Sequence, residues 1–275
     1  MARILMVAPA DDLLRALRCS PLLDGHTVDA AAGGFDALRQ LRRRAYDVLL
    51  SAPTTRIDED LAQLEVVRRV RPGIRVIVLA AHTTPEEVIA ALRSRVFALF
   101  SAPFDLSAIA DMVARAAVAE RYKEGIEVVS AKPDWISVRV NCRLLNAERL
   151  VNFFTELRSD LAECPRDELM FAFRVVLMNA MEHGGGFDPE QVVEVSAIRT
   201  ERTLVFYVRD PGPGFDVDDV PHAAASNRDP LAHTGARADA GLRPGGFGLL
   251  LARRIVDEML YSERANEVLL IKHLG

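Results

Sequence analysis

The sequence is poor in cysteine, in tryptophan and in long apolar runs, and it has no strong excess of one charge. Its three cysteines, Cys19, Cys142 and Cys164, lie far apart without a CxxC pair, which argues against a zinc site and is typical of a reducing compartment. No apolar stretch is long enough to span a bilayer, and the short apolar run at the N-terminus soon meets acids, so we expect neither a membrane segment nor a signal peptide. A net charge of -5 gives no electrostatic footprint for nucleic acid.

Half of the 275 residues are hydrophobic, which is enough to form a sizeable hydrophobic core. In the first half, five apolar runs alternate with five amphipathic segments, which predicts βαβ units and a parallel sheet. The runs are almost continuously apolar, as in strands buried on both faces, and the flavodoxin-like order 2-1-3-4-5 is expected. The expected strands are 3–7, 26–32, 46–51, 75–81 and 97–104, and the expected helices are 11–23, 34–44, 61–70, 85–94 and 106–122.

After about Tyr122 the strands and helices become grouped, which favours an α+β sandwich. Residues 121–133 contain glycine, proline and charges, and we interpret them as a connector between a domain over 1–120 and a domain over 134–275. The expected strands of the second domain are 135–141, 192–198, 203–209 and 267–273, and its expected helices are 146–161, 164–184 and 249–260.

Three features of the second half follow one another in a fixed order. Asn179 lies late in an apolar helix, where an amide needs partners. "DPGPGF" (210–215) then places an acid and two glycines directly after an expected strand. Finally, "RPGGFG" (243–248) places glycines immediately before a helix, where backbone N–H groups can approach an anion. Each feature is weak evidence alone, but together they predict a ligand site.

Here the chain resembles the GHKL ATP-binding fold, also called the Bergerat fold, of gyrase, histidine kinases and MutL. Within that group it looks most like the anti-sigma factor serine/threonine kinases. The resemblance covers about residues 134–275. "LMNAMEHGGG" is similar to the N box of the family, "DPGPGF" to its first glycine box and "GGFGLLLARRIVDEM" to its second. The expected architecture is therefore an α/β receiver-like domain followed by a GHKL α/β sandwich.

The resemblance implies ATP and Mg²⁺ as cofactors and assigns roles to individual residues. Asn179 would bind Mg²⁺ and, through it, the phosphates. Asp210 would accept from the adenine amino group, since a carboxylate only accepts and the amine only donates. Of the glycines, Gly212 and Gly214 would let the backbone pass close to the base, and Gly246 and Gly248 would present amides to the phosphates. About residues 216–244 would form a lid over the nucleotide.

One departure from the family bears on chemistry. Members that phosphorylate a protein usually carry a glutamate four residues before the N-box asparagine, one helical turn away on the same face. Here that position is Val175, which cannot accept a proton. Glu182 could replace it only if its side chain turned inward. The residues therefore support ATP binding better than ATP chemistry, and no catalytic residue is assigned.

The first half resembles the receiver domain of two-component response regulators over about residues 2–120, but without its chemistry. The acid pair that follows the first strand in receivers is replaced by Ala8 and Pro9, and the phospho-accepting aspartate aligns with Ala52. The switch hydroxyl aligns with Ala80, and the lysine before the proline aligns with Ala102. Aspartyl phosphorylation needs carboxylates for Mg²⁺ and a cation for the phosphoryl oxygens, so we expect a pseudo-receiver used for interaction.

These expectations combine into a cytoplasmic signalling regulator. Its ATP-binding domain would bind a protein partner in a nucleotide-sensitive way, such as a sigma factor or a STAS-type antagonist, and the pseudo-receiver would control or dock it. The alternative is an active serine/threonine protein kinase that phosphorylates such an antagonist. A third hypothesis, a degenerate scaffold that binds no nucleotide, is opposed by the intact glycines and Asn179. The resemblance also implies that homodimers can form, and we expect neither nucleic acid nor membrane as a partner.

Overall fold

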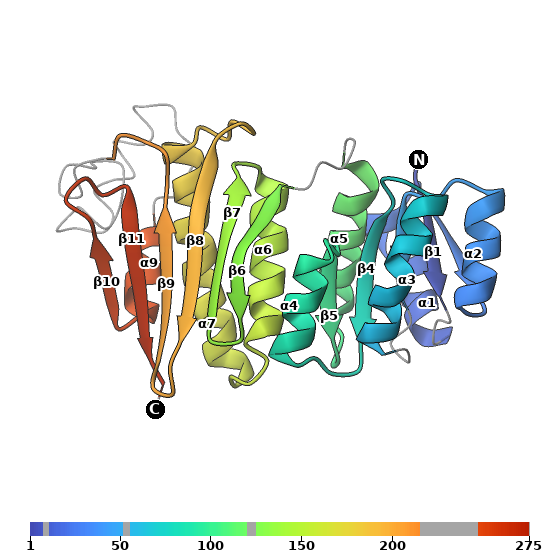
Figure 1. Cartoon of the computed structure of the whole chain (residues 1–275), viewed down its shortest axis with the longest axis horizontal. Helices are drawn as coiled ribbons and strands as arrows, with labels where there is room; N and C mark the ends of the chain where they lie inside the picture. Colours follow the sequence, from blue (N-terminus) through green and yellow to red (C-terminus); the bar gives the residue numbers. More distant parts are fainter. Residues whose placement is uncertain (8–10, 52–55, 120–124, 215–246, 275) are drawn as a thin grey trace. The chain divides into compact units, whose positions relative to one another are not determined.

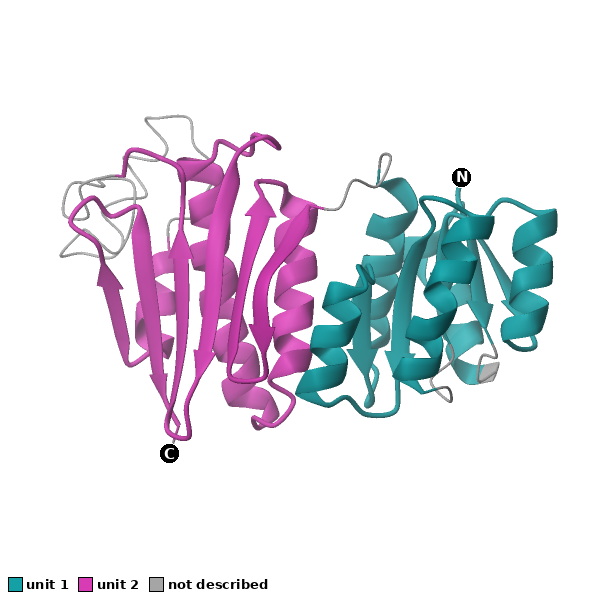
Figure 2. Cartoon of the chain, viewed as in Figure 1, with its two compact units in different colours: residues 1–124 teal, residues 125–275 magenta. Residues whose placement is uncertain are grey.

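The structure is a computed structural model of the chain, and it describes residues 1–7, 11–51, 56–119, 125–214 and 247–274 (Figure 1). The chain forms two compact units, Met1–Glu124 and Gly125–Gly275 (Figure 2). No helix among the described residues is long and apolar enough to cross a membrane.

The first unit is built around a five-stranded parallel sheet with the order β2-β1-β3-β4-β5. This is the flavodoxin-like order that the alternating pattern predicts, so the α/β prediction is confirmed. Four of the strands, β1, β3, β4 and β5, carry almost only buried residues, because helices cover both faces of the sheet, whereas the edge strand β2 is mostly half-buried. They are β1 Arg3–Val7, β2 Thr27–Ala31, β3 Val48–Leu50, β4 Arg75–Ala80 and β5 Ala98–Ser101.

Four helices connect these strands and a fifth, α5, follows β5, and each has an apolar face toward the sheet. In Figure 1, α1 and α5 lie on one side of the sheet, and α2, α3 and α4 lie on the other. Local capping sets two of the helix starts. Thr84 forms a reciprocal capping box with Glu87, and the Asp105 carboxylate accepts the N–H groups of Ser107 and Ala108. The helices are α1 Asp11–Arg18, α2 Gly34–Arg43, α3 Ile57–Val70, α4 Pro85–Arg93 and α5 Leu106–Val118, with a 3-10 turn, η1, at Pro21–Leu23.

The second unit contains a six-stranded antiparallel sheet with the order β10-β11-β9-β8-β7-β6. Figure 1 shows three helices, α6, α7 and α9, on one side of this sheet. The strands therefore alternate between buried residues on the helix side and more exposed residues on the other. They are β6 Ile126–Lys132, β7 Trp135–Asn141, β8 Val192–Arg199, β9 Thr203–Arg209, β10 Glu258–Tyr261 and β11 Glu267–His273.

An aromatic cluster joins the helices to the sheet in the second unit. Phe154 of α6 (Leu144–Leu157), Phe173 of α7 (Glu163–Asn179) and Phe206 of β9 pack together, with ring centroids 4.6 to 5.7 Å apart. All three are almost completely buried. Aromatic pairs at such spacing add to the free energy gained from burying their area. The α+β sandwich expected from the grouped elements is confirmed.

Two expectations about the second unit are wrong in detail. Residues 126–132, which we placed in a connector, form β6 at one edge of the sheet. The last helix, α9 (Gly248–Ile255), is shorter than the expected 249–260, because the chain turns at Val256 and begins β10 at Glu258. Both missed strands are edge strands, each with a single neighbour.

Candidate functional site

The acid of the "DPGPGF" stretch lies directly after β9, which ends at Arg209. The backbone N–H of Asp210 donates to the carbonyl oxygen of Asn266 at 3.0 Å, just before β11 begins. The Asp210 side chain folds back on its own loop, since its Oδ1 accepts the N–H of Gly212 at 2.8 Å. These two bonds fix both the backbone and the carboxylate at the end of the strand.

The Asp210 carboxylate loses water through burial and gains too few hydrogen bonds to make up for that loss. The side chain is half-buried, and burial raises its pKa above the ordinary 3.8, while the Gly212 N–H acts in the opposite direction. The charged form is thus less stable here than in water. A group in this state gains from a ligand that donates hydrogen bonds to it.

Two glycines approach Asp210 so closely that no side chain could replace their hydrogens. A β-carbon on Gly184 would lie 2.2 Å from both Cγ and Oδ1 of Asp210. A β-carbon on Gly212 would lie 2.8 Å from the same Oδ1 and 2.8 Å from the Cα of Gly184. Gly184 ends η2 (Ala180–Gly184), a π-helical turn that continues α7, so the end of the predicted N-box helix meets the predicted first glycine box.

Gly214 holds the same loop against the β10–β11 turn. Its φ of +86° favours glycine, and a β-carbon there would lie 1.7 Å from the carbonyl oxygen of Arg264. An alanine at this position would have to displace backbone, not merely a flexible side chain.

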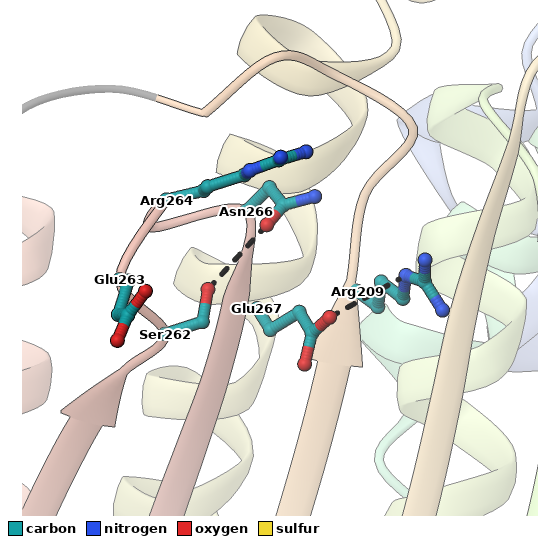
Figure 3. A pocket seen from close by; sticks show the side chains of 6 residues that line it. All are labelled: Arg209, Ser262, Glu263, Arg264, Asn266 and Glu267. Carbon is teal, nitrogen blue, oxygen red and sulfur yellow. Dashed lines mark hydrogen bonds and ion pairs between the residues drawn. The ribbon is translucent and has the colours of Figure 1, made fainter.

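A cavity of about 380 Å³ opens beside this loop (Figure 3). In Figure 3, Ser262 Oγ bonds to Asn266 Oδ1 at 3.4 Å, and Arg209 pairs with Glu267 at 3.6 Å. None of the residues assigned from sequence lines this cavity. Its lining residues adjoin them through Arg209, which precedes Asp210, and through the carbonyl oxygens of Arg264 and Asn266. Its lining consists of Arg209, Ser262, Glu263, Arg264, Asn266 and Glu267.

The thiol of Cys142 lies beneath the helix end. A β-carbon on Gly185 would lie 2.3 Å from its Sγ. Burial, followed by the negative charges of Asp188 and Asp210, raises the pKa of Cys142 to about 11. The thiol is therefore protonated at neutral pH and packs as a small apolar group.

The predicted second glycine box meets α7 at Val175. Gly248 is the first residue of α9, and α9 packs against α7. A β-carbon on Gly248 would lie 3.1 Å from Cγ1 of Val175, so the valine side chain points at the start of α9. Gly246 and the predicted lid, residues 216–244, lie outside the described residues.

Asn179 is the last residue of α7 and is half-buried. Its side chain caps no backbone N–H of the following turn. Glu182, the substitute base considered above, is exposed within η2. The structure thus brings Gly184, Asp210 and Gly212 into contact and places Val175 against Gly248.

In the first unit, two of the receiver positions considered above can be located. Ala80 ends β4 and is buried, and Ala102 directly follows β5. Ser51 directly follows β3 and is buried, and its Oγ accepts the N–H of Leu79 in β4 at 3.0 Å. Ala8, Pro9 and Ala52 lie outside the described residues. No group of three or more His, Cys, Asp or Glu side chains that could hold a metal ion occurs in the described part of the chain.

Comparisons with known proteins match one family and several regulatory proteins. Residues 142–272 match the family described as "Histidine kinase-like ATPase domain". The transcriptional regulatory protein GlrR of Escherichia coli is 34% identical over 158 residues, which are 54% of this chain and 33% of GlrR. The transcriptional regulatory protein ZraR of Salmonella typhimurium is 25% identical over 107 residues, which are 39% of this chain and 24% of ZraR. The chain thus spans about a third or less of the length of these relatives.

Among solved structures, the chemotaxis protein CheY4 of Vibrio cholerae is 19% identical, with a TM-score of 0.37, and the match covers 42% of this chain and 98% of CheY4. A response regulator from Thermotoga maritima is 20% identical, with a TM-score of 0.38, and the match covers 43% of this chain and 100% of that protein.

Proposed function

We propose that this chain, which joins a receiver domain to a histidine kinase-like ATPase domain, is a signalling regulator whose second unit binds ATP with Mg²⁺ and changes its affinity for a protein partner with the nucleotide state. The two domain types already indicate a signalling regulator. What we propose beyond that is the bound nucleotide and the kind of partner.

The observation that carries the proposal is the contact of Asp210 with Gly184 and Gly212. Both glycines leave the carboxylate uncovered, and one of its oxygens is engaged by the Gly212 N–H. The adenine amino group only donates and the carboxylate only accepts, so the two are complementary. Burial makes this match specific, because a base that presents an acceptor there would leave a buried charge unpaired.

The residues toward α9 fit the phosphates and the metal ion. The Asn179 side-chain oxygen is of the ligand type that Mg²⁺ accepts. Gly248, and Gly246 before it, would present backbone N–H groups at the positive end of α9. When bound, Mg²⁺ would offset the charge of the phosphates.

The contact between Val175 and Gly248 supports a binding role over a kinase. A glutamate at position 175 would point at the start of α9, where the phosphates would lie, but the valine offers only methyl groups. Glu182 is exposed on the following turn. The serine/threonine kinase therefore remains the second candidate, and it would need Glu182 to act as the base.

We propose that the first unit acts as an interaction domain. Ala80 and Ala102 occupy positions where receiver chemistry requires a hydroxyl and a cation, and alanine provides neither. Ser51 uses its hydroxyl to hold the ends of β3 and β4 together. The partner we propose is a protein in the cytoplasm, such as a sigma factor or a STAS-type antagonist, and the regulator could act as a homodimer.

Thermal melts and phosphate release test the proposal together. ATP with Mg²⁺ should raise the Tm of the full chain more than ATP with a chelator, because a ligand that binds only the folded state stabilises it. Phosphate release should stay at the background rate. Turnover that disappears in Glu182→Gln would favour the kinase, and no Tm change with millimolar ATP would reject nucleotide binding.

A further inference from the structure

One side of the sheet in the second unit is not covered by any described helix of that unit. Its helices α6, α7 and α9 all lie on the opposite side (Figure 1). The uncovered side, which we call the open face, carries large apolar side chains, since Trp135 is 54%, Ile198 39% and Leu260 48% exposed. Contiguous exposed apolar side chains commonly mark an interaction surface.

The strand register orders the open face into rows that run across the strands. Residues that the register pairs lie on the same side of the sheet, so a row can be followed from one strand to the next. One row is charged and lies near the end of β9 that leads into Asp210. From β6 to β11 this charged row consists of Glu127, Arg139, Glu194, Arg209 and Glu267. A second row, toward the other end of the strands, is apolar with charged ends. From β6 to β10 this apolar row consists of Lys132, Trp135, Ile198, Val205, Ile271 and Glu258.

Positive and negative charges alternate along the charged row. Neighbouring members pair within the sheet, as Arg139 and Glu194 do at 3.2 Å, but both side chains stay about half exposed. Arg209 and Glu267 form a similar half-exposed pair at 3.6 Å. Ion pairs in such exposed positions contribute little to the stability of one chain, and their charges can still act on a partner.

This order of charges is complementary to itself under one twofold rotation. The sheet has six strands, and its centre lies between β8 and β9. A twofold axis that runs along the strands at this centre would place β8 of one copy against β9 of a second copy, and β7 against β11. Glu194 would then face Arg209 of the second copy, and Arg139 would face Glu267 of the second copy. Each charge of these four strands thus meets its opposite.

The same rotation also matches the apolar row. Trp135 would face Ile271 of the second copy, and the oppositely charged row ends, Lys132 and Glu258, would face each other. Moving the axis by half a strand spacing, onto β8, would instead place Arg139 against Arg209, which is a repulsive contact. An axis across the strands would lay the charged row of one copy on the apolar row of the other and desolvate its charges. Only the central axis along the strands satisfies both rows.

We propose that the open face of the second unit binds a second copy of this chain, related by a twofold axis along the strands between β8 and β9. The proposal specifies the face used by the homodimer suggested above, and it does not depend on nucleotide binding. Six strands at about 4.8 Å and seven residues at about 3.3 Å give a face of roughly 24 by 20 Å, or about 1,000 Å² for two copies. This area is at the small end of specific interfaces, so the dimer should dissociate on dilution.

Charge reversals placed in separate chains test the facing pairs. Arg209→Glu would set two carboxylates against each other at each facing pair of a dimer, and Glu194→Arg would set two guanidinium groups there. Each variant alone should therefore dimerise at least tenfold more weakly than wild type. A mixture of the two variants restores one carboxylate and one guanidinium at both facing pairs, so mixed dimers should form.

Sedimentation velocity of the full chain over a concentration series measures dimer formation in each sample, and thermal melts check that each variant is folded. The matched control is Glu168→Arg, which makes the same charge change at an exposed position of α7, on the helix side of the sheet. This control should dimerise like wild type. If wild type dimerises but the mixture of Arg209→Glu and Glu194→Arg stays monomeric, the contact lies elsewhere and the proposal is overturned.

Trp135 reports on the open face directly, because it is the only tryptophan of the chain. Its emission maximum should move to shorter wavelength as the wild-type concentration rises through the Kd of the dimer, and should not move in Arg209→Glu. A wild type that is monomeric at every concentration, or an emission maximum independent of concentration, would overturn the proposal. The face would then be left free, or be covered within one chain or by another protein. None of these measurements uses nucleotide, so a failure of ATP binding would be seen separately.

Discussion

Replacing Asp210 by asparagine should change nucleotide affinity and stability in opposite directions. The amide keeps the size of the side chain, and its oxygen can still accept the Gly212 N–H. Its NH₂ group, however, would present a donor to the adenine amino group. Losing one partner of a buried polar contact costs about 1–3 kcal/mol, so the Kd for ATP should rise roughly 5- to 150-fold at about 1.4 kcal/mol per tenfold change.

The stability of the protein without nucleotide should not fall. The pKa of Asp210 is raised in the folded state, so the fold binds this proton more tightly than the unfolded chain does. The contribution of this group to stability is then greatest below pH 3.8 and falls as pH rises through its folded pKa. At pH 7 the charged side chain opposes folding, and the neutral asparagine should give an equal or higher Tm.

Asp257→Asn is the matched control. The N–H of His273 donates to Asp257 Oδ2 at 2.6 Å and is the main cause that lowers the pKa of this aspartate. The fold here favours the charge, so the control should have a lower Tm and an unchanged affinity for ATP. Calorimetric titration and thermal melts at pH 7 measure both quantities for each variant.

The choice of base gives an additional readout. Guanine has a carbonyl oxygen where adenine has its amino group, so the new amide can donate to it. The preference for ATP over GTP should therefore shrink in Asp210→Asn. Unchanged ATP affinity and an unchanged preference would refute the placement of Asp210 against the base.

Three other perturbations test the packing around the site. Gly184→Ala should lower both Tm and ATP affinity, because its β-carbon would overlap the Asp210 carboxylate. The control Gly33→Ala, whose β-carbon meets open space, should change neither quantity in the same thermal melts and ATP titrations. Val175→Glu should lower Tm, because it buries a charge. It should also raise phosphate release above wild type, since a positioned base contributes roughly 10²–10⁴ in rate. A folded variant that binds ATP without turnover would contradict the placement of residue 175 beside the phosphates. In the folded protein at pH 8, iodoacetamide should modify the two exposed cysteines but not Cys142, whose thiol is buried with a pKa of about 11, and mass spectrometry would reveal a third adduct if the packing were wrong.

The main elements of both units could be predicted because burial leaves a clear pattern in the sequence. The inner strands of the first unit and β5 are covered on both faces and appear as continuous apolar runs, and β7, β8, β9 and β11 alternate between the two sides of their sheet. The edge strands do not show such a pattern. In β6, the pairing with β7 shifts between Val128 and Ser130, which breaks the alternation. The residues of β10 continue the apolar pattern of the preceding helix, so the sequence does not mark where α9 ends.

The candidate site was only partly predictable for a related reason. The order of Asn179, the acid and the glycines is local and can be recognised in the sequence. The role of Gly184 depends on contact with Asp210, and the sequence indicates this glycine only as a helix end. Arg264 and Asn266 contribute backbone carbonyl oxygens, which any residue type supplies, so no pattern of side chains reveals them. In the sequence, Cys142 is only one of three widely separated cysteines, and its place beneath the site follows from the tertiary fold.

The central claim is that the second unit binds ATP with Mg²⁺ through Asp210, and calorimetric titration of the full chain with ATP tests it most directly. We predict saturable binding of one ATP per chain, weakened when Mg²⁺ is removed and weakened again in Asp210→Asn. Absence of binding by the folded wild-type protein at millimolar ATP and Mg²⁺ would contradict the account.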